Sequence, residues 1–110
     1  MIKSLRGMND ILSEDYERFT YFIKTATNVA QKYGFHFIQT PLLEETALFK
    51  RSVGDSSDIV SKEMYQFTDK GENDVCLRPE GTAGVVRAFI QKKLDKAGGT
   101  HRFFYHGAMF

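Results

Sequence analysis

The sequence has few of the residues that mark secreted, disulfide-linked or cysteine-dependent proteins. Its 110 residues include one cysteine, two prolines and no tryptophan. A single cysteine excludes a disulfide within the chain. The apolar neighbours Val75 and Leu77 predict that Cys76 is a buried small side chain rather than a nucleophile. Cysteine usage therefore favours a reducing, cytoplasmic setting.

Long apolar runs and an excess of one charge are also missing. No run approaches the roughly 20 residues that a membrane-spanning helix needs, and the first residues lack the apolar core of a signal peptide. The chain carries 15 basic and 14 acidic side chains, evenly spread over its two halves. A dedicated nucleic-acid module is usually more basic. We expect no membrane partner, and composition does not predict a polyphosphate partner.

The common catalytic and metal-binding motifs are absent as well. His36, His101 and His106 are far apart and share no spacing with cysteine or acidic residues, so no metal site is expected. There is no phosphate-binding or dinucleotide-binding glycine pattern and no nucleophile elbow. Glu44 and Glu45 are adjacent, so their side chains are expected to point in different directions, which disfavours a catalytic carboxylate pair.

What is present is an apolar content of 42%, enough for the core of one domain or part of one. The clearest element is a helix from an N-cap at Ser13 to Tyr33, followed by Gly34 at the C′ position. Its apolar residues recur at steps of three and four, which predicts a core-facing stripe. The stripe consists of Tyr16, Phe19, Phe22, Ile23, Ala26, Val29, Ala30 and Tyr33.

Strands and a second helix are predicted in the middle of the chain. Phe35–Thr40 has the aromatic and β-branched residues of a strand that ends at Pro41. A short helical pattern runs from Glu44 to Val53, and a polar loop from Gly54 to Ser61. An antiparallel hairpin is predicted from two strands, Met64–Asp69 and Val75–Arg78, and the turn between them.

The last part of the chain predicts one more helix and one more strand. The helix runs from Thr82 to Ala97, with lysines near its end, and stops at Gly98-Gly99. Arg102–Phe110 is apolar on both faces, which favours a central strand. The chain ends inside this strand, so we expect it to be a fragment of a longer protein.

The stretch Leu77-Arg78-Pro79-Glu80-Gly81-Thr82 places several polar groups at a corner between a strand and a helix. Glu80 and the Thr82 hydroxyl can accept hydrogen bonds from an ammonium group, Gly81 allows close approach to the backbone, and Arg78 can fix Glu80 or hold an anion. The corner is therefore a candidate amino-acid site. Local pattern alone favours a plain helix start over a site, with Thr82 as N-cap and Glu80 near the positive end of the helix dipole.

Six segments in order resemble histidyl-tRNA synthetases, and together they span nearly the whole chain. They are Arg6–Asp10, Tyr33–Glu44, Leu48–Arg51, Lys62–Tyr65, Leu77–Thr82 and Gly107–Phe110. The resemblance implies an α+β fold, part of the class II synthetase antiparallel sheet flanked by helices. Residues 1–110 would form the N-terminal portion of that catalytic domain, without the anticodon-binding domain.

The resemblance also implies roles for particular residues. Glu80, Gly81 and Thr82 match the loop that holds histidine, with Arg78 as support. The Ser13–Tyr33 helix and the strand ending at Pro41 resemble motif 1, the homodimer-forming element. Arg102–Phe110 resembles the first half of motif 2, without the arginine that follows it in the family. No catalytic residue is assigned.

The whole enzyme would use ATP and Mg²⁺ to activate histidine and transfer it to tRNA(His). The fragment alone is expected to be inactive and to bind no cofactor tightly. Two alternatives stay open: a synthetase-like regulatory subunit of ATP phosphoribosyltransferase, and a dimerisation module without catalysis.

Overall fold

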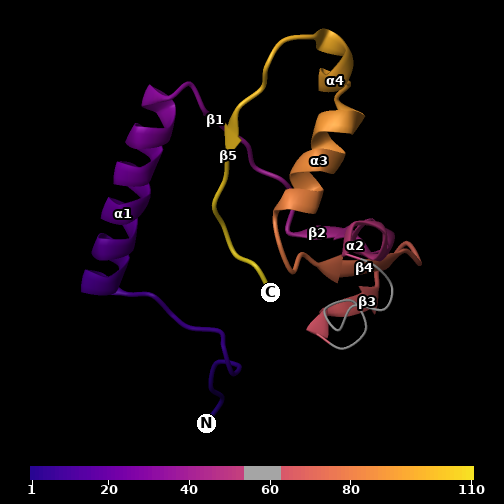
Figure 1. Ribbon diagram of the computed structural model, residues 1–110. Helices are drawn as coiled ribbons and strands as arrows, with labels where there is room; N and C mark the ends of the chain where they lie inside the picture. Colours follow the sequence, from indigo (N-terminus) through magenta and orange to yellow (C-terminus); the bar gives the residue numbers. More distant parts are fainter. Residues whose placement is uncertain (54–62) are drawn as a thin grey trace. The chain divides into compact units, whose positions relative to one another are not determined.

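The computed structural model describes residues 1–53 and 63–110. The predicted polar loop at Gly54–Ser61 lies outside the described residues. The chain divides into two compact units, Met1–His36 and Phe37–Phe110. Figure 1 labels the helices and strands of each unit.

The first unit contains a single helix, α1 (Ser13–Lys32). Its C-terminal end is the one predicted: Gly34 has φ +80°, its N–H donates to Gln31 O at 3.0 Å, and Phe35 N–H donates to Ala30 O at 3.1 Å. These two hydrogen bonds form a Schellman cap, which favours glycine at the C′ position.

The predicted N-cap of α1 was wrong by one residue. The cap position is occupied by Leu12, whose backbone is extended, and no side chain caps the helix there. The N–H groups of Asp15 and Tyr16 both donate to Leu12 O, so the first helical turn already includes Ser13. Ser13 therefore lies inside the helix, where its hydroxyl is not in the capping position.

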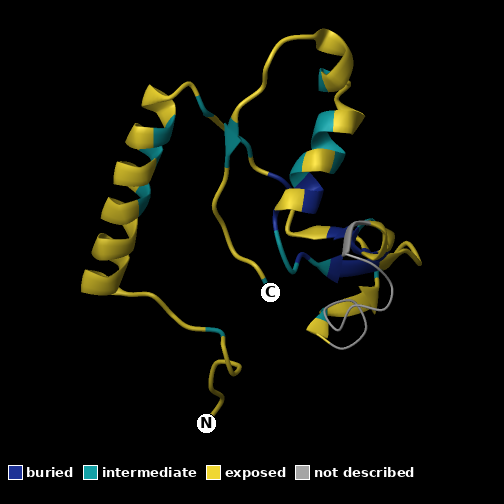
Figure 2. Cartoon of the chain, in the orientation of Figure 1, coloured by how far each residue is buried: buried dark blue, intermediate teal, exposed yellow. Residues whose placement is uncertain are grey.

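The predicted burial of the α1 stripe was also wrong. No residue of α1 is buried, and Figure 2 shows the helix mostly in the exposed colour. Phe19 in the middle of the stripe is 52% exposed. The periodicity correctly predicted an amphipathic helix, but a pattern cannot show whether this chain itself covers the apolar face.

The second unit is built on a three-stranded antiparallel sheet of order β2-β4-β3, formed by β2 (Leu43–Glu45), β4 (Asp74–Leu77) and β3 (Gln66–Thr68). The pairing of Phe67 with Val75 confirms the predicted hairpin. In its turn the Asp69 carboxylate accepts the N–H groups of Asn73 and Gly71. The hydrogen bonds from Asn73, the larger cause, and from Gly71 hold the pKa of Asp69 below its ordinary range.

The sequence did not predict strand β2. The helical pattern assigned from Glu44 is a strand up to Glu45, and the helix α2 runs from Thr46 to Val53. Glu44 pairs with Cys76 of β4, so tertiary pairing outweighs the local helical pattern.

The core of the second unit lies between the sheet and two helices. Phe49 of α2, Cys76 of β4 and Ala83 of helix α3 (Thr82–Gln91) are buried together, with Leu48 and Met64 packed against them. Burial raises the pKa of the Cys76 thiol. Cys76 is therefore a buried small side chain, as predicted.

The last predicted helix is interrupted. It forms α3 (Thr82–Gln91) and a short α4 (Leu94–Ala97), separated by Lys92 and by Lys93, whose φ is +58°. A non-glycine residue in the left-handed region ends a helix. The predicted stop is correct, since Gly98 caps α4 with φ +77°.

The first and last strands of the chain are much shorter than predicted. Only β1 (His36–Phe37) and β5 (Phe103–Phe104) are strand, and they form a sheet of their own. The division between the units falls inside β1. From Phe37 onward, Ile38 N–H donates to Phe104 O at 3.1 Å, and the Phe37 and Phe104 rings meet edge to face. β5 is only half-buried, so the expected central strand was wrong. The α+β class is confirmed.

Candidate functional site

The corner after β4 is held by Arg78, whose side chain is only 7% exposed. Its Nε donates to Ala108 O at 2.9 Å, and its Nη1 lies 3.2 Å from both the carbonyl and the hydroxyl oxygen of Thr40. Its backbone N–H donates to Leu42 O, and its carbonyl accepts from Phe110 N–H. Arg78 thus links three separate segments of the second unit at the point where the corner begins.

The segment after β5 leaves space for this guanidinium. A Cβ atom added to Gly107 would lie 2.5 Å from Arg78 Nη2. Glycine is therefore needed at 107 for close approach to Arg78. Arg78 donates to Thr40 and Ala108 rather than to Glu80, so its support of the corner acts through the backbone.

Glu80 caps helix α3 with both of its carboxylate oxygens. Oε2 accepts the N–H of Thr82 at 2.7 Å, and Oε1 accepts the N–H of Ala83 at 2.9 Å. These are two of the N–H groups that have no partner inside a helix. A carboxylate at this end also meets the positive end of the helix dipole. The carboxylate is half-buried and fixed in place, and each oxygen retains a lone pair for another donor.

Gly81 is the N-cap residue of α3, with φ −102° and ψ −24°. These angles suit any residue, so glycine is not required by the backbone conformation. A Cβ atom at Gly81 would lie 2.5 Å from Cε2 of the Tyr105 ring and 3.0 Å from Met109 Cε. Gly81 thus makes room for an aromatic ring of the protein itself.

Thr82 is the first residue of α3 and not its N-cap. Its side chain is exposed, and its Oγ1 lies 2.6 Å from the hydroxyl oxygen of Tyr105. The corner therefore offers a fixed carboxylate and a fixed hydroxyl, two residues apart, at a helix N-terminus. A carboxylate and a neutral acceptor together suit a ligand that carries an ammonium group.

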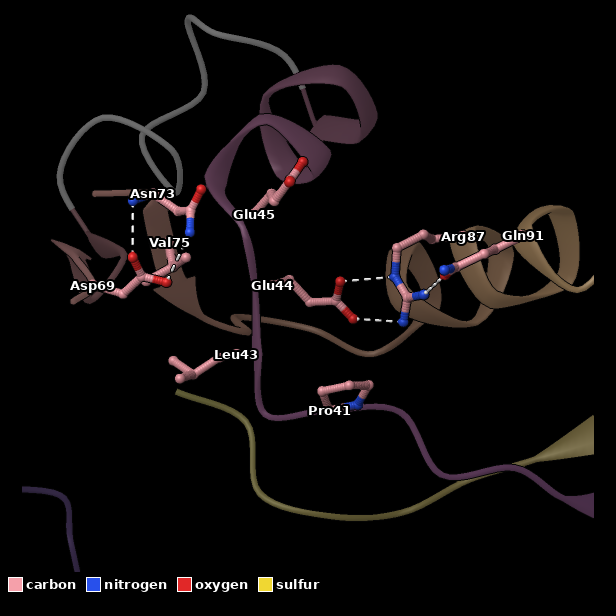
Figure 3. Close-up of a pocket in the computed structure, with 9 residues that line it drawn as sticks. All are labelled: Pro41, Leu43, Glu44, Glu45, Asp69, Asn73, Val75, Arg87 and Gln91. Atoms are coloured by element: carbon pink, nitrogen blue, oxygen red, sulfur yellow. Dashed lines mark hydrogen bonds and ion pairs between the residues drawn. The ribbon is translucent and has the colours of Figure 1, made fainter. Parts of the chain in front are cut away.

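A second polar region lies across β2 and the middle of α3, around a hollow of ≈ 600 Å³. Figure 3 shows Glu44 and Arg87 facing each other there, while Glu45 points elsewhere. Arg87 Nη2 donates to Glu44 Oε1 at 2.9 Å, and Arg87 Nε lies 2.7 Å from Oε2. The Glu44 side chain is buried and Arg87 is partly exposed. The side chains of Glu44 and Glu45 point in different directions, as predicted.

The structure brings together three of the site residues predicted from sequence. Glu80, Gly81 and Thr82 lie at one helix start, whereas Pro41 is an exposed residue that follows the buried Thr40. Sequence reasoning missed Tyr105 and the partners of Arg78. A tyrosine in an apolar run was the available signal for Tyr105, because its hydroxyl needs a polar partner.

Residues 1–53 and 63–110 contain no group of three or more His, Cys, Asp or Glu side chains placed to bind a metal ion. None of the helices in this part of the chain has the length and apolar character that a membrane crossing requires.

Comparison with known proteins relates this geometry to one family. The model of the family described as histidyl-tRNA synthetase matches residues 7–110. The histidine–tRNA ligase of Sulfurimonas denitrificans is 87% identical over 110 residues, all of this chain and 27% of that protein. The ligase of Nitratiruptor sp. is 70% identical over 109 residues, 99% of this chain and 27% of that protein. The chain thus spans about a quarter of the length of these relatives.

Solved structures agree with the sequence comparison. Apo histidyl-tRNA synthetase of S. aureus matches with a TM-score of 0.86 and 39% identity, covering 100% of this chain and 26% of that one. A Bacillus halodurans protein described as an ATP phosphoribosyltransferase regulatory subunit/histidyl-tRNA synthetase matches with a TM-score of 0.79 and 26% identity, covering 100% and 28%. The matching helices and antiparallel sheet give the chain a class II synthetase-like α+β fold. This chain belongs to the histidyl-tRNA synthetase family.

Proposed function

We propose that the chain is part of a histidine–tRNA ligase, which uses ATP to activate histidine and transfers it to tRNA(His). The observation that carries the proposal is the 87% identity to a protein named histidine–tRNA ligase over all 110 residues. The regulatory-subunit alternative is less well supported, since its structural relative is 26% identical.

Within that enzyme, Glu80, Gly81 and Thr82 hold the histidine substrate. The Glu80 carboxylate faces the α-ammonium and supplies the charge, and the Thr82 hydroxyl supplies a neutral acceptor. The α3 N–H groups that bind Glu80 fix its orientation before the ligand arrives, which supports this assignment. Arg78 holds the corner in place through Thr40 and Ala108.

ATP with Mg²⁺ is the second substrate of the proposed reaction, but the described arginines near the corner do not suit its phosphates. Arg78 is buried and hydrogen-bonded to Thr40 and Ala108, and Arg87 is paired with Glu44. We therefore assign neither guanidinium to ATP. The cytoplasm is the proposed compartment, as for other steps of protein synthesis.

A homodimer is the proposed assembly, formed through α1 and the segment that contains Pro41. The exposed apolar stripe of α1 supports a protein partner for that helix. Light scattering on the chain over a range of concentrations tests this proposal. A monomer at every concentration would remove α1 as a self-sufficient dimer element.

The ligase proposal is tested with a chimeric ligase, in which this chain replaces the matching 110 residues of the S. denitrificans enzyme. We expect histidine-dependent ATP–pyrophosphate exchange close to that of the parent enzyme. We expect none from the 110 residues alone, since they cover only 27% of that relative. An inactive but folded chimera would contradict the proposal.

The site assignment is tested in the same chimera. Glu80→Gln removes the charge that faces the ammonium, so the KM for histidine should rise by roughly ten- to a hundredfold. Glu17→Gln, which changes an exposed glutamate of α1, is the matched control and should leave this KM unchanged. An unchanged histidine KM for Glu80→Gln would remove Glu80 from the site.

A further inference from the structure

Tyr105 lies outside the proposed histidine loop and contacts it closely. It follows β5 and lies 23 positions along the chain from Thr82, yet the two hydroxyl oxygens are 2.6 Å apart. The Tyr105 ring fills the space beside Gly81, where a Cβ atom would lie 2.5 Å from its Cε2. The ring is thus packed against the loop, and its hydroxyl is held on Thr82.

The direction of the hydrogen bond between these hydroxyls follows from the ligand. An ammonium group has three N–H donors and no acceptor. In the proposed site Thr82 Oγ1 accepts from the ligand, which leaves its own proton for another acceptor. The Tyr105 oxygen lies within hydrogen-bond distance of Thr82 Oγ1, and by geometry either hydroxyl can be the donor.

We propose that Tyr105 is a positioning residue for histidine binding: its phenolic oxygen takes the Thr82 proton and so directs a Thr82 lone pair at the substrate ammonium. The inference rests on the proposed histidine site. It adds a residue from the segment after β5 to the proposed histidine loop at 80–82. The glycine at 81 is then needed by the Tyr105 ring.

The consequence is a coupling between two side chains. Tyr105→Phe keeps the ring beside Gly81 and removes only the acceptor. The Thr82 hydroxyl is then free to rotate, and its proton competes with the ligand for the same position. The expected loss is that of one neutral hydrogen bond, about three- to tenfold in the KM for histidine. The kcat should change little, because the interaction is made equally with bound substrate and transition state.

The experiment is a double-mutant cycle in the chimeric ligase. Tyr105→Phe, Thr82→Val and the double variant are compared by their histidine KM and kcat in ATP–pyrophosphate exchange. If Tyr105 acts through Thr82, Tyr105→Phe raises KM in the parent and has no further effect once Thr82 is valine. Thr82→Ser, which keeps a hydroxyl, should retain the dependence on Tyr105. Tyr65→Phe, at an exposed tyrosine of the same unit, is the control.

Each outcome decides the proposal. A KM that Tyr105→Phe leaves unchanged, or additive effects of the two substitutions, would overturn it. A fall in melting temperature with unchanged KM would show a packing role only. If only the role of Tyr105 is wrong, Glu80→Gln still raises the KM for histidine. If the proposed histidine site is wrong, Glu80→Gln leaves that KM unchanged as well.

Discussion

The two units of this chain place their unusual residues in opposite ways. In Met1–His36 the large apolar side chains of α1 are exposed, and no residue of the helix is buried. Among the described residues of Phe37–Phe110, four polar or charged residues are buried, including Glu44 and Arg78. Exposed apolar area favours association, whereas buried charge requires partners that fix its position. We therefore propose an interface on the first unit and a ligand site on the second.

The buried charges of the second unit act on the start of helix α3. Arg78, two residues before Glu80, donates hydrogen bonds to Thr40 and Ala108. The Glu44–Arg87 pair links β2 to α3 five residues after Thr82. Buried polar networks of this kind fix one arrangement of the segments that they join. The predictions below test the difference between the units, from the largest expected effect to the smallest.

Phe19→Glu should have the largest effect, on association. Phe19 lies in the middle of the α1 stripe and is 52% exposed. In a two-fold symmetric dimer the substitution occurs once in each subunit. Each side chain loses about 2 kcal/mol of apolar burial free energy, so dimerisation weakens by at least about a hundredfold. Sedimentation of the chimeric ligase measures this change.

Tyr21→Glu is the matched control for that prediction. Tyr21 is 73% exposed and lies on the opposite face of the same helix. It should leave the dimerisation constant unchanged. Equal effects of the two variants would mean that the stripe is an ordinary solvent-exposed face, and the contrast between the units would fail.

Arg78→Met should destabilise the second unit by about 3 kcal/mol. The substitution removes charged hydrogen bonds and leaves buried Thr40 without its partner. Urea unfolding of the chain measures the loss. Arg18→Met removes an exposed arginine 3.9 Å from Glu14 and should cost less than about 0.5 kcal/mol. Similar losses for the two arginines would show that Arg78 does not organise the corner.

Glu44→Gln should cost somewhat less, about 2 kcal/mol in the free energy of unfolding. Breaking a buried pair leaves an uncompensated charge, but Arg87 is partly exposed and water screens part of the effect. Glu45→Gln changes the neighbouring exposed glutamate and is the control. If the two variants unfold at the same urea concentration, the Glu44–Arg87 pair contributes nothing to stability.

Much of this arrangement could be predicted from sequence, because its signals are local. The α1 helix, its cap at Gly34, the hairpin around Asp69 and the corner at Glu80 each follow from spacing and turn chemistry. Strand β2 could not be predicted, since only its pairing with β4 makes this segment a strand. Nor could Tyr105, whose role depends on a contact 23 residues away.

The central claim is that Glu80 binds the ammonium of histidine, and one measurement tests it directly. Histidine and its α-hydroxy analogue, which lacks the ammonium, are compared as competitors in the chimeric ligase before and after Glu80→Gln. The account predicts a preference for histidine that falls at least about tenfold in the variant. An unchanged preference would contradict it.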